Sequence, residues 1–189
     1  LLDEESIICV YAEAIVHRIF EERPNFVILR LVEKFLDYYN PEFREKVAKV
    51  IKAIDMKEAF SILIGELQNK ADPERRWKAA RAFAELARLF DYPAKEIGEE
   101  EFSRVTQALI QSAESDSNFE VRWMAIESLR VWGATEATEP LISMLKDSKE
   151  PLFNALVKTL MKLIPLKVEA LPSLIKDQPA SVRHIIVSI

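Results

Sequence analysis

The chain has 189 residues, of which 49% are hydrophobic and 30% are charged. This composition is typical of a folded globular protein and excludes a disordered chain. Only three residues are glycine, which disfavours folds with many tight turns and favours long helices joined by short loops. The formal net charge of -5 gives no general attraction for phosphate and therefore disfavours nucleic acid as a partner. An all-α protein is expected.

Cys9 is the only cysteine, so an internal disulfide is excluded and a reducing, cytoplasmic location is expected. No apolar run reaches the roughly 18 residues that would predict a membrane span. The first residues, Leu1-Leu2-Asp3-Glu4-Glu5, lack the basic start of a signal peptide. Because the first residue is not Met and Ile189 closes an amphipathic run without a stop signal, we expect the sequence to be a piece of a longer chain.

Four helices are predicted in residues 1–71. Apolar residues at three- and four-residue steps predict the first helix over residues 3–22. Asn25 can cap the second helix, Pro41 opens the third, and Asp55 starts the fourth with a sequence similar to a capping box. This region is therefore predicted to form two divergent helix hairpins.

The helices after residue 71 have clearer end signals. Asp72-Pro73 is an N-cap followed by proline in the first turn. Glu99 begins an acidic run that favours a helix N-terminus, and Gly133 is a C-terminal stop. The predicted helices cover residues 72–90, 99–113, 118–132, 137–146, 150–163, 167–176 and 179–189.

An internal repeat is the strongest signal in the sequence. Leu141-Ile142-Ser143-Met144-Leu145-Lys146-Asp147 recurs thirty residues later as Leu171-Pro172-Ser173-Leu174-Ile175-Lys176-Asp177. The spacing from Asp116 to Val121-Arg122 returns between Asp177 and Val182-Arg183. A fixed period of this size indicates stacked helical units, each of which buries its apolar face against its neighbours.

Residues 72–189 resemble HEAT repeats, close to the short bacterial and archaeal kind that also occurs in phycobilin-lyase-like proteins. Arg76-Trp77-Lys78-Ala79 aligns with Arg122-Trp123-Met124-Ala125 at an offset of 46 residues. The resemblance implies an armadillo-type, right-handed α-solenoid of about five antiparallel helix hairpins plus a terminal helix. We expect residues 1–189 to form a single solenoid domain.

In the HEAT family, the Asp of a turn and the Arg six residues later form hydrogen bonds between successive repeats. The pairs that match this pattern are Asp116 with Arg122 and Asp177 with Arg183.

Two repeats depart from that pattern. Asp147 is followed six residues later by Phe153. After Asp72 the same spacing leads to Lys78, whereas the Arg-Trp alignment indicates Arg76. The sequence alone does not decide whether Lys78 or Arg76 fills the arginine position of this repeat.

Motifs for catalysis or metal binding are missing from the sequence. The two histidines, His17 and His184, are far apart in sequence and the glycines are isolated, which excludes zinc-protease and phosphate-loop motifs. The His-Glu pairs that bind iron in deoxyhypusine hydroxylase, an enzyme of the HEAT family, do not occur. Cys9, Glu13 and His17 lie at four-residue steps and could bind a metal, but tetrahedral sites usually draw ligands from more than one element. We predict no enzyme, cofactor or metal site.

Candidate partner-binding residues follow from the repeat. Trp77 and Trp123 occupy matching places, where they either form an aromatic patch for a partner or pack against the adjoining repeat. Basic residues along the Asp72 helix either bind an acidic partner or form a solvated surface. By family analogy the second helix of each hairpin lines the concave face. The candidates are Arg76, Trp77, Arg81, Trp123 and Arg130 on first helices, and Gln107, Gln111, Ser143, Lys146, Ser173 and Lys176 on second helices.

Three functions are consistent with these observations. The leading hypothesis is a non-catalytic scaffold or adaptor that binds another protein along its concave surface. The second is a nucleic-acid-binding protein resembling the alkylation-repair DNA glycosylases, in which Trp77, Trp123 and the arginines would contact bases and phosphates. The third is a subunit of a bilin-lyase-like, cofactor-handling complex.

Overall fold

The structure is a computed structural model. It describes residues 14–15, 18–19, 21–23, 26–28, 30–31, 50, 56–88, 97–149, 151–164, 176 and 180–188. Throughout these ranges the regular secondary structure is helical, as the composition predicts. None of the helices in these ranges combines the length and the apolar character that crossing a membrane requires. Contacts divide the chain into two compact units, Leu1–Glu66 and Leu67–Ile189.

The first unit contains most of helix α4, Met56–Leu67. Phe60 and Leu63, one turn apart, are buried, as the predicted apolar face requires. Val27 and Ile28 of the predicted second helix are buried as well. The first and third predicted helices lie largely outside the described residues.

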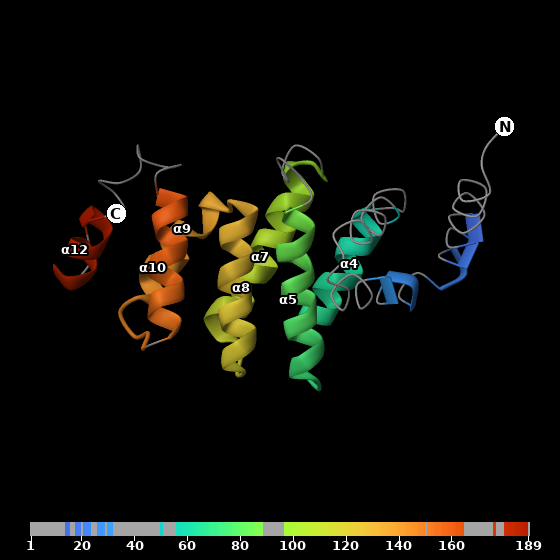
Figure 1. Cartoon of the computed structure of the whole chain (residues 1–189), viewed down its shortest axis with the longest axis horizontal. Helices are drawn as coiled ribbons and strands as arrows, with labels where there is room; N and C mark the ends of the chain where they lie inside the picture. The colour runs from blue at the N-terminus through green and yellow to red at the C-terminus, as the bar shows by residue number, and fades with distance from the viewer. Residues whose placement is uncertain are drawn as a thin grey trace, which may run out of the picture. The chain divides into compact units, whose positions relative to one another are not determined.

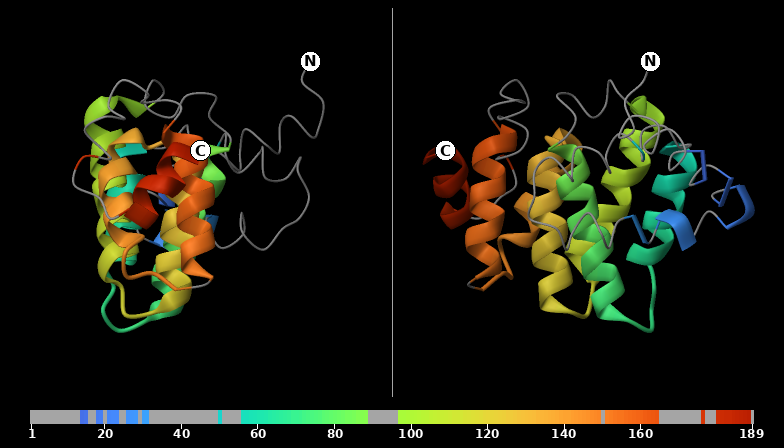
Figure 2. Two further views of the ribbon diagram at one scale, coloured as in Figure 1. Left: turned by 90° about the vertical axis from the view of Figure 1, so that its left-hand side faces the viewer. Right: turned by 45° about the vertical axis from the view of Figure 1, so that its right-hand side comes forward.

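The second unit is a stack of helix hairpins. Helices α5, α8 and α10 stand side by side (Figure 1), and we call them the first-helix layer. Helices α7 and α9 form a second layer, which the view along the stack separates from the first (Figure 2, left); we call it the second-helix layer. This is the arrangement of an all-α solenoid. The elements are α5 (Pro73–Ala87), α7 (Glu99–Ser115), α8 (Phe119–Trp132), the 3-10 helix η1 (Thr135–Ala137), α9 (Thr138–Met144), α10 (Leu152–Leu163) and α12 (Ala180–Ser188).

Local sequence signals fix the ends of these helices. The Asp72 carboxylate accepts a hydrogen bond of 2.9 Å from the backbone N–H of Glu74, so the predicted N-cap of α5 is confirmed. Asn118 caps α8 in the same way and accepts from the backbone N–H of Glu120 at 2.8 Å. Gly133 ends α8 with a left-handed backbone, at φ of 67°, a conformation that glycine adopts without a steric cost.

The first helices pack on one another in a repeated register. The Ser128 hydroxyl on α8 lies 2.7 Å from the Ala80 carbonyl on α5, and it shares its single proton between this acceptor and a carbonyl of its own helix. The Thr159 hydroxyl on α10 lies 3.5 Å from the Ile126 carbonyl on α8. Ala80 and Ile126 are 46 residues apart, the same offset that aligns the Arg-Trp motifs. The core residues at a shared position of the three helices are Phe83, Leu129 and Leu160, all fully buried.

The sequence repeat itself is described only in part. Leu141, Ile142 and Leu145 of the first copy are buried, and the helix predicted over residues 137–146 is present as α9 with a 3-10 turn at its start. The second copy lies outside the described residues, except for the exposed Lys176.

Candidate functional site

A buried ion pair joins the first two repeats of the second unit. Arg76 on α5 donates from Nε to Oδ2 of Asp116 at 2.7 Å and from Nη2 to Oδ1 at 2.9 Å. The two side chains are only 10% and 6% exposed. Arg76 also donates to the Asn69 carbonyl at 2.8 Å. This two-point geometry is the strongest form of an arginine–carboxylate contact.

The surroundings of Asp116 hold its carboxylate in the charged form. Burial by itself raises the pKa of Asp116, but the hydrogen bonds from Arg76 and from the backbone N–H of Asn118 outweigh it, and the pKa lies below its ordinary value. The same hydrogen bond raises the pKa of Arg76. Arg76 therefore links two repeats through this ion pair. Because its side chain is buried, it is not available to contact a partner, and it does not belong to the partner-binding residues that the sequence predicted.

The sequence expectation for this contact needs a correction. Asp116 was expected to bond with Arg122, yet the partner of its carboxylate is Arg76, 40 residues earlier. Arg122 instead folds back over the preceding turn and donates to the Asp116 carbonyl at 2.7 Å. Lys78, the other candidate in the first repeat, pairs with Glu74 of its own helix at 2.9 Å. The Arg-Trp alignment therefore identified the correct residue, Arg76.

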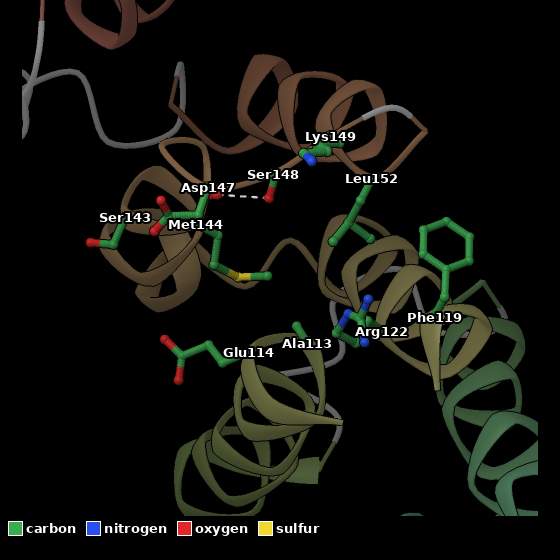
Figure 3. Close-up of a pocket in the computed structure, with 10 residues that line it drawn as sticks. All are labelled: Ala113, Glu114, Phe119, Arg122, Ser143, Met144, Asp147, Ser148, Lys149 and Leu152. Atoms are coloured by element: carbon green, nitrogen blue, oxygen red, sulfur yellow. Dashed lines mark hydrogen bonds between the residues drawn. The ribbon is translucent and has the colours of Figure 1, made fainter. Parts of the chain in front are cut away.

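The next repeat has no equivalent ion pair. Arg122 and Asp147 occupy the places of Arg76 and Asp116, but in the described part of the chain neither makes a salt bridge. Both line a surface cavity of about 590 Å³. Figure 3 shows Arg122 on α8, Glu114 on α7 and Asp147 after α9 on different sides of this cavity.

The predicted residues of the second-helix layer are exposed on neighbouring elements. Gln107 and Gln111 are exposed on α7. Ser143 on α9 and Lys146 in the following turn are exposed too, and α9 packs against α7. The structure thus brings these four polar residues onto neighbouring elements of one layer. Ser173 lies outside the described residues, and Lys176 is exposed.

The two tryptophans of the first-helix layer behave differently. Trp77 is half-buried, and the Arg81 guanidinium lies 5.4 Å from the centre of its ring, a cation–π distance. Trp123 is 38% exposed. Trp77 is thus less exposed than Trp123 and contacts an arginine of its own helix.

Arg130, the remaining candidate on α8, is paired within its own helix. Its Nε donates to the Glu127 carboxylate at 2.9 Å. This hydrogen bond lowers the pKa of Glu127 against the opposing effect of burial, and it raises the pKa of Arg130.

Sequence reasoning missed two lysines on α10. Lys158 and Lys162 are both exposed and one turn apart. Lys158 follows Glu127 by 31 residues, the offset that separates Asp116 from Asp147. Extending the repeat offset to every surface position would have placed Lys158 beside Glu127.

Comparison with known proteins finds a repeat family in part of the chain. Residues 106–188 match the family model for HEAT repeats, so this segment is similar to HEAT repeats. One solved structure similar to the chain is the crystal structure of an engineered protein, which is 20% identical, with a TM-score of 0.48, and covers 93% of this chain and 87% of its own. No curated protein matches the chain.

Proposed function

We propose that the chain is a non-catalytic HEAT-repeat scaffold that binds another protein along its second-helix layer. The supporting observation is that α7 and α9 pack against each other and carry, with the turn after α9, the exposed polar residues Gln107, Gln111, Ser143 and Lys146. Hydrogen-bonding side chains on a rigid helical frame suit recognition of a folded or extended partner. No catalytic motif in the sequence competes with this interpretation.

The layer has the physical properties that a binding surface requires. Its inner side is anchored by buried residues of both helices, including Leu109 on α7 and Leu141 on α9. The exposed side chains therefore project from a frame with little freedom to rearrange, which reduces the entropy lost on binding.

Site-specific photo-crosslinking tests the proposal. A photoreactive amino acid is placed at Gln111 or at Ser143, and the matched control carries it at Glu120, exposed at the start of α8 on the first-helix layer. We expect the two second-layer positions to capture the same protein from the native cytosol while the control does not capture it. Capture of that protein from Glu120 alone, or turnover of a substrate by the purified chain, contradicts the proposal.

The nucleic-acid hypothesis is less well supported than the scaffold. One of its arginines, Arg76, is buried in the ion pair with Asp116, and Trp77 is half-buried, with the Arg81 guanidinium 5.4 Å from its ring centre. The bilin-lyase-like hypothesis stays a prediction, and the absorbance spectrum of the purified protein tests it.

A further inference from the structure

Basic residues gather near the C-terminal ends of the three first helices. Arg88 caps α5, and Arg130 and Lys162 lie in the last turns of α8 and α10. Lys158 lies one turn before Lys162. Cations are stabilised at these positions by the helix dipole. Because α8 packs against both α5 and α10, these four side chains belong to one continuous surface, which we call the basic end.

Glu127 links the members of the basic end. It accepts a hydrogen bond from Arg130 at 2.9 Å and lies 3.9 Å from Nη2 of Arg88. The positive charges of Lys158 and Arg88 also contribute to the lowered pKa of Glu127, after the hydrogen bond from Arg130. The Glu127 carboxylate therefore interacts electrostatically with cations from three helices.

The charges of the basic end do not balance. Glu85 pairs with Arg88 at 2.7 Å, and Glu127 serves Arg130. Lys158 and Lys162 make no salt bridge in the part of the chain that the structure describes. Partial burial is the main cause of the lowered pKa of Lys162; the positive charge of Arg130 lowers it further, and Glu127 opposes the shift. The two described carboxylates thus face four cations. A chain of net charge -5 thus holds a local surplus of cations.

Exposed apolar side chains accompany these lysines. Met161 is 56% exposed and precedes Lys162. Trp123 is 38% exposed on α8, two helical turns before Arg130 and hence on the same side of the helix. Apolar groups bordered by unbalanced cations suit a ligand that carries both carboxylates and apolar side chains.

We propose that the basic end binds an acidic, partly apolar segment of a partner protein. The carboxylates of the segment contact Lys158 and Lys162, and its apolar side chains cover Met161 and Trp123. Nucleic acid is the poorer match, because the embedded Glu85 and Glu127 would repel a continuous row of phosphates. This surface lies on the first-helix layer, so the inference is independent of a partner on the second-helix layer.

Fluorescence polarisation tests the inference with a labelled peptide of Glu and Leu residues. The matched peptide has Gln in place of every Glu. We expect the acidic peptide to bind at low salt and the Gln peptide to bind at least about tenfold more weakly, because charge attraction is lost. Equal binding of the two peptides, or no binding of the acidic one, overturns the inference.

Charge reversal locates the site. The Lys158→Glu, Lys162→Glu double variant should weaken binding of the acidic peptide by about tenfold. The control reverses the exposed Lys70 and Lys149, which changes the net charge equally, and should retain binding within about threefold. Equal losses in the two double variants overturn the assignment.

Two further probes distinguish a peptide site from other sources of binding. Met161→Gln leaves the charge unchanged and should weaken the acidic peptide by about threefold through loss of apolar contact. A short DNA duplex should bind more weakly than the acidic peptide. Tighter binding of DNA that also depends on Lys158 and Lys162 contradicts the peptide assignment.

Discussion

The step from α5 to α8 and the step from α8 to α10 share a backbone register but differ in the side chains that join them. At the first step Arg76 and Asp116 form a buried ion pair. At the second step Arg122 and Asp147 line a cavity without pairing. Because the register persists where the ion pair is missing, apolar packing and the hydroxyl–carbonyl contacts are sufficient to define it. The ion pair adds stability to one step and does not determine the fold.

The largest predicted difference between the steps comes from removing one acidic residue. Asp116→Ala leaves the Arg76 charge buried without a partner, so we expect the free energy of unfolding to fall by about 3 kcal/mol. Asp147→Ala removes an exposed side chain and should change it by less than about 0.5 kcal/mol. Urea unfolding monitored by circular dichroism measures both. If both variants lost a similar amount of unfolding free energy, the two steps would be stabilised in the same way, which would contradict the comparison.

The pH dependence of stability isolates the charge of Asp116. Because its pKa is lowered in the folded chain, the stability that its charge provides is present above the unfolded value, about 4. That stability is lost as the pH falls through the folded pKa. The difference in unfolding free energy between the native chain and Asp116→Asn should therefore narrow when urea unfolding is repeated from pH 7 towards pH 3. A difference independent of pH would contradict the role of the ionised carboxylate.

The starts of α8 and α10 can be compared by removing a side-chain cap from one helix and adding a capping residue before the other. Asn118 is the N-cap of α8, and its carbonyl accepts from the backbone N–H of Arg122 at 3.2 Å. Lys149 lies 31 residues later, two residues before the N-cap Pro151 of α10, and its carbonyl accepts from the backbone N–H of Phe153 at 3.1 Å. Asn118 also caps with its side chain, which lysine cannot do. Asn118→Ala should cost about 1 kcal/mol, whereas Lys149→Asn should add up to about 1 kcal/mol. Thermal unfolding measures both, and a destabilising Lys149→Asn would contradict the equivalence.

The smallest predicted difference concerns the two hydroxyls that mark the shared register. Ser128→Ala removes a buried contact of 2.7 Å with the Ala80 carbonyl and should cost about 1 kcal/mol. Thr159→Val removes a contact of 3.5 Å, which is weak at that length, and should cost less than about 0.5 kcal/mol. Urea unfolding of the two variants ranks them. The opposite ranking would mean that the second step depends more on its hydroxyl than the first.

Local signals explain why the helices could be predicted from the sequence. The α8 helix was predicted over residues 118–132 and spans Phe119–Trp132, because Asn118 and Gly133 encode its two ends. Asp72 encodes the start of α5 in the same way. Each signal depends on residues within one turn, so it can be recognised without knowledge of the rest of the fold.

The contacts between repeats were harder to predict because they depend on residues far apart in sequence. Arg76 and Asp116 are 40 residues apart, and the spacing within one repeat pointed to Arg122 and Lys78 instead. The basic end likewise forms only when three helices lie side by side, because Lys158 and Glu127 are 31 residues apart in the sequence. Extending the repeat offset to surface positions would have shown that Lys158 occupies the place of Glu127 in the next repeat. It would not have shown that Arg122 folds back over the preceding turn.

The carbonyls of Ala80 and Ile126 receive hydroxyls from the next first helix at equivalent places. A segment bounded by equivalent junctions is modular. We expect that a duplicate of residues 117–147, inserted after Asp147, would pack against an equivalent helix surface on each side and lengthen the array by one hairpin. The same property would let such a protein gain or lose units by gene duplication and deletion while its flanking hairpins keep their packing.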